Sequence, residues 1–139
     1  MAEDAPPLPL PQPTDVDRPF WEAATEGRLL LQRCRATGAV WARPQAASPA
    51  TGRTADVEWF EARGFGRVFS FTVVRHAPDP AFQARSPYVL ALIDLDEGAR
   101  MLAGVVGPDA LETRIGDPVR VVFEARGHGF NAPQFVRNH

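Results

Sequence analysis

The sequence predicts a mainly β protein that is organised around a small closed β-barrel, and three observations lead to this fold class. The run from Gly64 to His76 is β-branched or aromatic at most positions, as expected for a long and largely buried strand. Turn residues separate the further apolar runs that follow, at 88–96, 100–107, 119–125 and 133–136. Helix signals are confined to two short segments, at 17–27 and 108–116.

Side-chain alternation in the first of these strands predicts two distinct faces. Phe69, Phe71 and Val73 share one face, and the other face holds Val68, Ser70, Thr72 and Val74. We interpret the aromatic side chains of this stretch, Phe65 included, as core residues. Gly64 and Gly66 predict a bend or β-bulge, which would let the strand cross from one side of a barrel to the other.

Length and charge limit the classes of function. A chain of 139 residues forms one compact domain with one hydrophobic core. Its net charge of −2 and pI near 5.9 give no basic field of the kind that nucleic-acid-binding surfaces carry, so we expect no nucleic acid as partner. All fifteen cations are arginine, which indicates either a coding bias or an adaptation to phosphate or carboxylate ligands.

Residues 1–16 predict a flexible, proline-rich arm. Five prolines within residues 1–13 exclude a helix and favour a solvated tail, although a ligand for an SH3-type domain is an alternative. The segment has neither the basic region nor the apolar run of a signal peptide or anchor. One cysteine excludes an internal disulfide and fits a reducing compartment, so we expect a soluble cytoplasmic protein that does not enter a membrane.

A short helix is predicted within residues 17–27, because Pro19 suits a first helical turn and Gly27 suits the position after the last one. Phe20 and Trp21 are adjacent and therefore point in different directions. One of them can cover the core while the other lies against the following segment. Alternatively, one of them docks into a partner subunit, because exposed aromatic side chains mark interfaces.

Two similar turns follow the first predicted strand, which covers residues 28–34. They are Cys34-x-x-Thr37-Gly38 and Ser48-Pro-x-Thr51-Gly52, and cysteine at Thr37, Ser48 and Thr51 would turn them into the paired knuckles of a zinc ribbon. Cys34 is alternatively a nucleophile, but no histidine neighbours it in the sequence and no feature indicates a depressed thiol pKa. We interpret Cys34 as a vestigial metal ligand.

Several motifs fall in register between residues 17 and 136. They include the two knuckles together with Pro-Phe-Trp-Glu-Ala, Gly-x-Leu-x-x-Gln-Arg-Cys, Gly-x-Val-x-Ser-Phe-Thr-Val-Val, Pro-Tyr-Val-Leu-Ala-Leu-Ile-Asp-Leu-Asp-Glu-Gly, Ile-Gly-Asp-Pro-Val-Arg-Val-Val-Phe-Glu and Pro-Gln-Phe. Together they resemble the acyl-CoA-associated OB-fold family, whose members carry an N-terminal helix, a rubredoxin-like zinc ribbon and an OB barrel. The resemblance implies a helix and lead-in strand at 17–33, a ribbon at 34–56 and a five-stranded OB-fold barrel at 57–139.

The resemblance also implies four metal-ligand positions, of which only Cys34 keeps a thiolate donor. Neutral hydroxyls at Thr37, Ser48 and Thr51 are poor zinc ligands, so we predict a degenerate ribbon without zinc. A structural zinc can supply roughly 10 kcal/mol or more of folding free energy, and its absence needs compensation. We expect this from Val40 and Trp41, packed on the barrel, and from hydrogen bonds between the hydroxyls and nearby amides.

A ligand site is predicted beside the mouth of the barrel. The loop at 77–87 follows the long strand, and in the family that the chain resembles it lies next to that mouth. We expect Phe82 to stack on the adenine of a coenzyme A thioester and Arg75 or Arg85 to bind one of its phosphates. The simpler interpretation is an ordinary loop with one buried aromatic side chain.

No nucleophile with an adjacent base, phosphate-binding glycine loop or metal-ligand set is evident, so we predict no catalytic residue. By resemblance, the chain is expected to be a non-catalytic accessory subunit of a thiolase-superfamily enzyme of lipid metabolism, namely a thiolase, a lipid-transfer-type thiolase or aldolase, or an acyltransferase. Phe20, Trp21 and Trp41 would form the docking surface, and self-association is a further expectation. The alternatives are an OB-fold module for single-stranded nucleic acid and an independent hydrolase or thioesterase.

Overall fold

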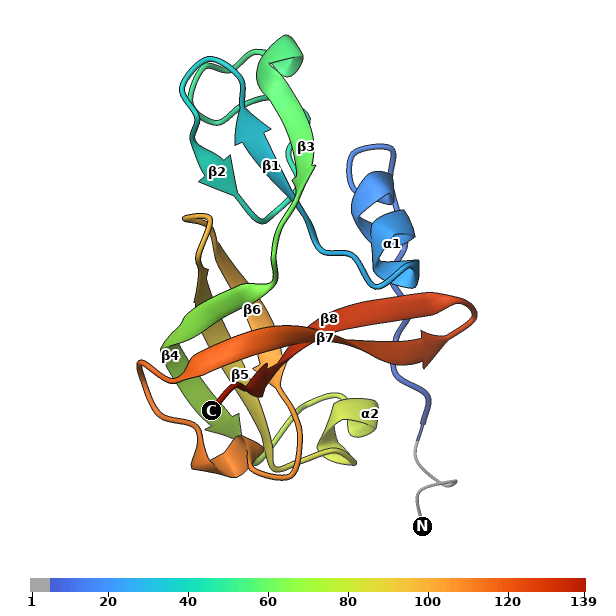
Figure 1. Cartoon of the computed structure of the whole chain (residues 1–139). Helices are drawn as coiled ribbons and strands as arrows, with labels where there is room; N and C mark the ends of the chain where they lie inside the picture. The colour runs from blue at the N-terminus through green and yellow to red at the C-terminus, as the bar shows by residue number, and fades with distance from the viewer. Residues whose placement is uncertain (1–5) are drawn as a thin grey trace.

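The structure, a computed structural model, describes residues 6–139, which form a three-stranded sheet and a closed barrel (Figure 1). The N-terminal part contains α1 (Arg18–Thr25), β1 (Leu30–Cys34), β2 (Val40–Trp41), η2 (Thr54–Asp56) and β3 (Val57–Glu61). The barrel part contains β4 (Phe65–Val74), α2 (Pro80–Gln83), β5 (Tyr88–Leu95), β6 (Arg100–Val105), η3 (Ala110–Glu112), β7 (Pro118–Gly127) and β8 (Phe130–Arg137).

The N-terminal sheet has the strand order β2-β1-β3. β3 pairs antiparallel with β1 along its whole length, from Leu30 opposite Glu61 to Cys34 opposite Val57. The predicted boundary placed residue 57 at the start of the barrel, whereas in the structure β3 completes the three-stranded sheet and β4 is the first barrel strand. Residues 57–61 belong to this sheet because all five of them pair with β1, and no local pattern in these residues predicts that partner.

The barrel closes in the order β4-β5-β6-β8-β7, which confirms the predicted five-stranded OB-type barrel. β4, β5 and β6 form an antiparallel meander, and β7 and β8 form a long hairpin that returns to β4. Closure between β6 and β8 rests on one parallel pair, Val105 opposite Phe135. The two strands therefore diverge beyond this pair, and this gap positions the candidate site.

A β-bulge in β4 overturns two expectations about its aromatic side chains. The register with β5 shifts between Val68 and Ser70, so the alternation of inward and outward side chains reverses there. Phe71 packs against the core, but Phe69 is 46% exposed and does not share its face. Phe65 is 36% exposed. The interpretation of Phe65 and Phe69 as core residues was therefore wrong.

The two glycines before the bulge allow β4 to approach its neighbours closely. Gly64 has a φ of +86°, and a Cβ placed there would clash with Cγ1 of Val121 on β7. A Cβ on Gly66 would clash with the carbonyl oxygen of Asp94 on β5. The predicted bulge thus lies after the glycines, and the glycines themselves serve close packing.

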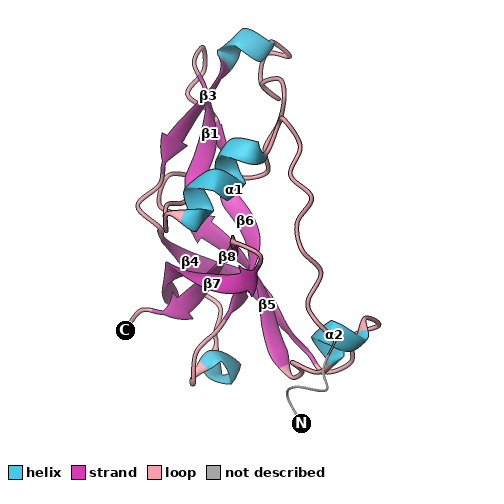
Figure 2. Cartoon of the chain, turned by 90° about the vertical axis from the view of Figure 1, so that its right-hand side faces the viewer, coloured by secondary structure: helices cyan, strands magenta, loops and turns pink. Residues whose placement is uncertain are grey.

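One hydrophobic cluster joins the two β units. Leu29, Leu31 and Ala62 at the base of the three-stranded sheet belong to the same buried cluster as Ile93 and Phe135 in the barrel. α1 lies across the junction of the two units (Figure 2), and the Asn131 side-chain amide on β8 donates to the Ala24 carbonyl at 3.2 Å. This packing fixes the helix, and hence Phe20 and Trp21, beside one end of the barrel.

Residues 6–17 precede α1 without helix or strand and run alongside the barrel toward α2 (Figures 1 and 2). The first five residues of the predicted arm lie outside the described residues. Within residues 6–139, no helix is long and apolar enough to cross a bilayer.

Candidate functional site

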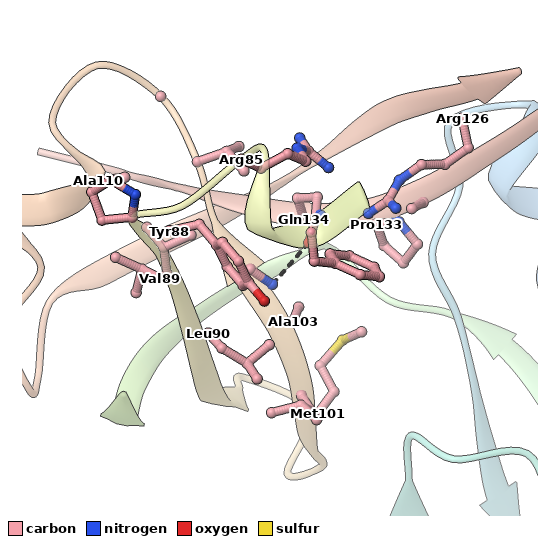
Figure 3. A pocket seen from close by; sticks show the side chains of 18 of the residues that line it. Arg85, Tyr88, Val89, Leu90, Met101, Ala103, Ala110, Arg126, Pro133 and Gln134 are labelled. Carbon is pink, nitrogen blue, oxygen red and sulfur yellow. Dashed lines mark hydrogen bonds between the residues drawn. The ribbon is translucent and has the colours of Figure 1, made fainter. Parts of the chain in front are cut away.

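A groove of about 660 Å³ lies where β6 and β8 diverge. Its walls come from α1, the α2 loop, β5, β6, the segment through η3, β7 and β8, and most of its lining is apolar. The lining side chains include Phe20, Trp21, Phe82, Arg85, Tyr88, Leu90, Leu102, Arg126 and Gln134. Figure 3 shows Arg85 and Arg126 at one end of the groove, near Pro133 and Gln134, and Leu90 and Met101 toward the other.

The loop at 77–87 holds its side chains in place through a short helix. Asp79 caps α2 by accepting a hydrogen bond from the Ala81 amide at 2.8 Å. The Gln83 side chain then accepts from the Ala77 amide and donates to the Ser86 hydroxyl, which closes the loop on itself. This local frame presents Phe82 to the groove, where its ring lies 6.2 Å from that of Tyr88.

Arg85 and Arg126, at the upper end of the groove in Figure 3, form a charged cluster with Glu124 of β7. Arg85 Nη2 donates to Glu124 Oε2 at 2.9 Å. Arg126 Nε lies 3.1 Å from Glu124 Oε1, but the two atoms are not aligned for a hydrogen bond, and both are buried without a hydrogen-bond partner among the described residues. Desolvation acts to raise the pKa of Glu124, but Arg85 and Arg126 hold it below its usual value. With Glu124 ionised, the cluster carries one positive charge in excess.

The structure separates the predicted ligand-binding residues. It brings Phe82 and Arg85 together at the groove, and Phe20 and Trp21 of α1 line the same groove with their rings 5.1 Å apart. Arg75 is exposed and does not line the groove. Phe20 also packs against the core and Trp21 against Phe130, so neither projects freely as a docking side chain.

Trp41 serves the three-stranded sheet. Its indole N–H donates to Gln32 Oε1 at 2.6 Å, and the same oxygen accepts from the Gln45 amide at 2.7 Å. Gln32 is 2% exposed, and its Nε2 donates to the Gln45 carbonyl at 3.1 Å. Gln32 thus ties the loop after β2 to the centre of the sheet, a role that no local sequence pattern indicated.

Several groove residues escaped the sequence analysis. Arg126 and Gln134 lie on the β7–β8 hairpin. The predicted strand at 119–125 ended one residue before Arg126, and Gln134 lies within the predicted run at 133–136 but was given no role there. Gln134 Oε1 accepts from the Gly104 amide at 2.8 Å and so bridges β6 and β8 beside the groove. The sequence signal for Arg126 was its position two residues after Glu124 on one strand, because alternate residues share a face and the two side chains could be expected to lie together.

The two predicted knuckles have the same backbone hydrogen bonds. In residues 34–39, the Cys34 amide donates to the Ala39 carbonyl and the Gly38 amide donates to the Cys34 carbonyl. In residues 48–53, the Ser48 and Gly52 amides repeat this pattern with the Arg53 and Ser48 carbonyls. Both glycines have positive φ, +78° for Gly38 and +75° for Gly52. The ribbon outline is therefore intact in both halves.

Side-chain hydroxyls complete the knuckles. Ser48 Oγ accepts from the Ala50 and Thr51 amides at 3.1 and 3.3 Å. The Thr51 hydroxyl donates to Asp56 Oδ2 at 2.7 Å. These contacts agree with the expectation that hydroxyls bond to nearby amides, and they engage the Ser48 and Thr51 oxygens within the fold.

Cys34 has an unusual environment that the sequence did not indicate. The thiol is 1% exposed, and the Ser48 and Thr37 hydroxyls donate hydrogen bonds to its sulfur. These bonds lower the pKa of the Cys34 thiol from its ordinary 9.0 to about 7. The expectation of an unperturbed thiol was therefore wrong. The groups that shift the pKa are hydroxyls and amides rather than an imidazole, so no thiol–histidine pair arises.

The residues at the knuckles do not fit a zinc ion. One thiol and three hydroxyls lack the charge of a zinc-ribbon ligand set, and Thr51 already donates its proton to Asp56. Within residues 6–139, no three histidine, cysteine or acidic side chains gather in a way that could hold a metal. The absence of zinc from the protein itself stays a prediction.

Comparison with known proteins gives two family matches. The rubredoxin-like zinc ribbon domain of ChsH2 matches residues 21–44, and the C-terminal OB-fold domain of ChsH2 matches residues 59–124. In the solved structure of an Ltp2–ChsH2(DUF35) aldolase, one chain has a TM-score of 0.80 and 34% identity, with coverage of 92% of this chain and 98% of that one.

Two curated relatives add names to this family. A DUF35 domain-containing scaffold protein from Methanothermobacter thermautotrophicus is 33% identical over 110 residues, which cover 79% of this chain and 82% of the relative. A probable enoyl-CoA hydratase alpha subunit from Thermomonospora curvata is 41% identical over 123 residues. The match covers 86% of this chain but only 37% of the hydratase subunit's length.

Proposed function

This chain belongs to the DUF35 family of ChsH2-like proteins, and from this premise we propose that it is a non-catalytic accessory subunit of a thiolase-superfamily enzyme that acts on acyl-CoA. Its relatives are described as a scaffold protein, a hydratase alpha subunit and a component of an aldolase, each a name for part of an assembly. The observation that carries the ligand part of the proposal is the groove between β6 and β8, which combines an apolar lining with an excess of positive charge at one end.

The groove suits a ligand with an apolar body and an anionic group. Its volume of about 660 Å³ lies within the range of roughly 300–1,000 Å³ that is usual for small-molecule sites. Phe82, Tyr88 and Trp21 provide flat apolar surfaces along the groove, and we propose that Phe82 stacks on the adenine of the ligand. An acyl or pantetheine segment would lie along the apolar walls.

The Arg85–Glu124–Arg126 cluster provides the anionic end. Planar guanidinium groups bind phosphate oxygens through paired N–H donors. Arg126 has a side chain that is only 13% exposed, so an anion that reaches it meets a partly desolvated charge, where electrostatic attraction is stronger than in water. A phosphate of coenzyme A would bind Arg85 and Arg126 together.

We also propose a cellular location, a class of catalytic partner and a metal-free knuckle region. We propose a cytoplasmic location, which the free thiol of Cys34 fits because a reducing compartment preserves it. We propose a thiolase, lipid-transfer-type thiolase or aldolase, or acyltransferase as catalytic partner, and a knuckle region without zinc.

The first experiment tests the partner. The chain is co-expressed with the thiolase-superfamily polypeptide encoded beside it, and the mixture is separated by size-exclusion chromatography with mass determination. The proposal expects a stable complex in which acyl-CoA turnover depends on both polypeptides. A chain that elutes alone, and a catalytic subunit that is fully active alone, would refute it.

The second experiment tests the ligand on the isolated chain. Titration with coenzyme A and with a medium-chain acyl-CoA is followed by tryptophan fluorescence, because Trp21 lines the groove. Arg85→Gln should weaken binding about tenfold or more, since it removes a charge-assisted contact. Arg75→Gln is the matched control, because it makes the same change at an exposed arginine that does not line the groove, and it should bind like the wild type. Equal effects of the two variants would exclude the groove as the ligand site.

A further inference from the structure

The outer face of β4 carries an alternating row of arginine and phenylalanine. From residue 62 to 69, buried and exposed residues alternate, and the exposed ones are Arg63, Phe65, Arg67 and Phe69, which we call the Arg–Phe row. Both rings are exposed, Phe65 by 36% and Phe69 by 46%. A strand that packs only its inner face against a core needs no large apolar side chains on the outside, so this row needs another explanation.

The arginines of this region lack carboxylate partners. None of the salt bridges among residues 6–139 includes Arg63, Arg67 or Arg120, although eight other arginines of the chain are paired. Arg120 lies directly across from Phe65 in the β4–β7 register and is exposed as well. Three unpaired guanidinium groups thus surround one exposed ring on a chain with a net charge of −2.

Part of this row is held in a fixed geometry. Arg67 Nη1 donates to the Gly116 carbonyl at 3.1 Å, and the Arg63 guanidinium lies over the Phe65 ring at 5.4 Å. A cleft of about 230 Å³ lies between these side chains, and Asp96 also lines it. Two guanidiniums against one carboxylate leave the cleft with an excess positive charge, and its size suits a single acidic side chain.

The row is continuous with the groove. In the register of the barrel, Ser70 next to Phe69 lies opposite Leu92, and Leu92 lies opposite Leu102 on β6. Leu102 is 61% exposed and also lines the groove. One outer sheet face therefore runs from the Arg–Phe row to the open side of the proposed ligand site.

We propose that this outer face of β4, β5 and β6 is the docking surface for the catalytic subunit, through a patch on that subunit that carries carboxylates beside apolar side chains. The proposal rests on the function proposed above and names the surface that would perform it. Arginine and aromatic side chains are enriched at the centre of protein interfaces, where lysine and glutamate are depleted. A partner seated here would also cover the groove at Leu102 and complete the ligand site.

A protein partner fits this face better than single-stranded nucleic acid does. Nucleic-acid bases need free aromatic faces on which to stack. The Phe69 ring is covered by the Arg100 guanidinium at 3.4 Å, and one face of Phe65 is covered by Arg63. Carboxylates of a partner can approach the guanidinium edges without displacing these contacts.

The test measures affinity for the co-expressed thiolase-superfamily polypeptide by isothermal titration calorimetry. Arg63→Glu with Arg67→Glu should weaken the complex about tenfold or more, since like charges face each other across the interface. Because Arg67 holds the Gly116 loop, Arg63→Glu with Arg120→Glu is a second variant with the same expected direction. The matched control is Arg43→Glu with Arg53→Glu, which changes the same charge on exposed arginines in the connection between β2 and η2 and should leave affinity within about twofold.

The outcomes separate this inference from the proposed function. No complex with the wild-type chain refutes both. A complex that both Arg–Phe variants leave intact, or that only the Arg43 and Arg53 variant weakens, refutes this docking surface and keeps the accessory role. Binding of a fluorescent oligothymidylate that is lost in Arg63→Glu with Arg67→Glu would show a nucleic-acid surface instead. Circular dichroism and coenzyme A binding of each variant confirm that the fold and the groove are unchanged.

Discussion

Different interactions hold the knuckle end of the three-stranded sheet and the barrel. The barrel buries large apolar side chains such as Ile93 and Phe135, each 0% exposed. The knuckle end buries Cys34 and Ser48, each 1% exposed, and satisfies them by hydrogen bonds between hydroxyls, a thiol and backbone amides. The barrel is stabilised by the removal of apolar surface from water, whereas the knuckle end is stabilised by hydrogen bonds between its buried polar groups.

This difference explains how one region can change its chemistry and keep its shape. A zinc ribbon concentrates its stability in four ligands, so losing three of them should abolish it. Here the knuckle backbone is closed by its own hydrogen bonds and by positive-φ glycines, and Gln32 fixes the neighbouring loop from within the sheet. The barrel cannot compensate in this way, because its core is close-packed and no other interaction replaces the contacts that a truncated core side chain loses.

Restoring the ligand set should have the largest effect. With cysteine substituted at Thr37, Ser48 and Thr51, the chain should bind one zinc ion, a change worth roughly 10 kcal/mol or more in small zinc-ribbon peptides. Zinc content and the thiolate-to-metal absorption of the cobalt form report the outcome. The same triple variant with Cys34→Ser is the control and should bind much more weakly. Failure of the tetrathiolate variant would show that the two knuckles do not face each other as ligand pairs.

The second-largest effect should come from a cavity in the core of the barrel. Phe135→Ala removes a fully buried ring at the pair that closes β6 on β8, and it should cost about 3–5 kcal/mol of unfolding free energy. Urea denaturation measures this. Leu102→Ala, at a side chain that is 61% exposed, should change stability by no more than about 0.5 kcal/mol. A similar cost for both variants would contradict the assignment of the core.

Removing the buried glutamine should have an intermediate effect on the three-stranded sheet. Gln32→Leu leaves the Trp41 indole N–H and the Gln45 amide without an acceptor, which should cost about 1–3 kcal/mol. Hydrogen exchange should increase at the loop after β2 more than in the barrel. Arg33→Ala, on the opposite face of the same strand, should have a smaller effect. If exchange increases equally in the three-stranded sheet and in the barrel, the two units unfold together and the sheet does not open on its own.

The smallest effect concerns the Cys34 thiol. Ser48→Ala removes the main donor to the sulfur, so the pKa of Cys34 should rise from about 7 toward its ordinary 9.0. Because the folded pKa is depressed, this thiolate contributes stability that is fully present above pH 9.0 and is lost as pH falls through about 7. The ultraviolet absorbance of the single thiolate, followed against pH, gives the midpoint.

The control for this measurement is Thr51→Ala, whose hydroxyl donates to Asp56 rather than to the sulfur. Its midpoint should match that of the wild type. A Ser48→Ala midpoint that stays near 7 would mean that the Thr37 hydroxyl and the amides of Thr37 and Ala36 set the pKa without Ser48.

Much of the fold was predictable because its signals are local. Pro19 and Gly27 marked the helix, and the alternating runs at 88–96 and 100–107 became β5 and β6 almost unchanged. The candidate site was only partly predictable. Phe82 and Arg85 stood out in a proline-rich loop, but Arg126 joins them through a hairpin, and Arg75, equally conspicuous in the sequence, points elsewhere.

The sequence by itself determined the order of elements, the two knuckle turns and the kinship with ChsH2-like proteins, because turn glycines, strand alternation and motif spacing act over a few residues. Only the tertiary structure decided that Phe65 and Phe69 face outward, that Cys34 is a weakly acidic thiol and that two distant arginines share one glutamate. The β4 bulge turns Phe69 outward, the second knuckle brings Ser48 to Cys34, and the fold brings the α2 loop to β7. Each of these contacts depends on which distant parts of the chain pair with one another.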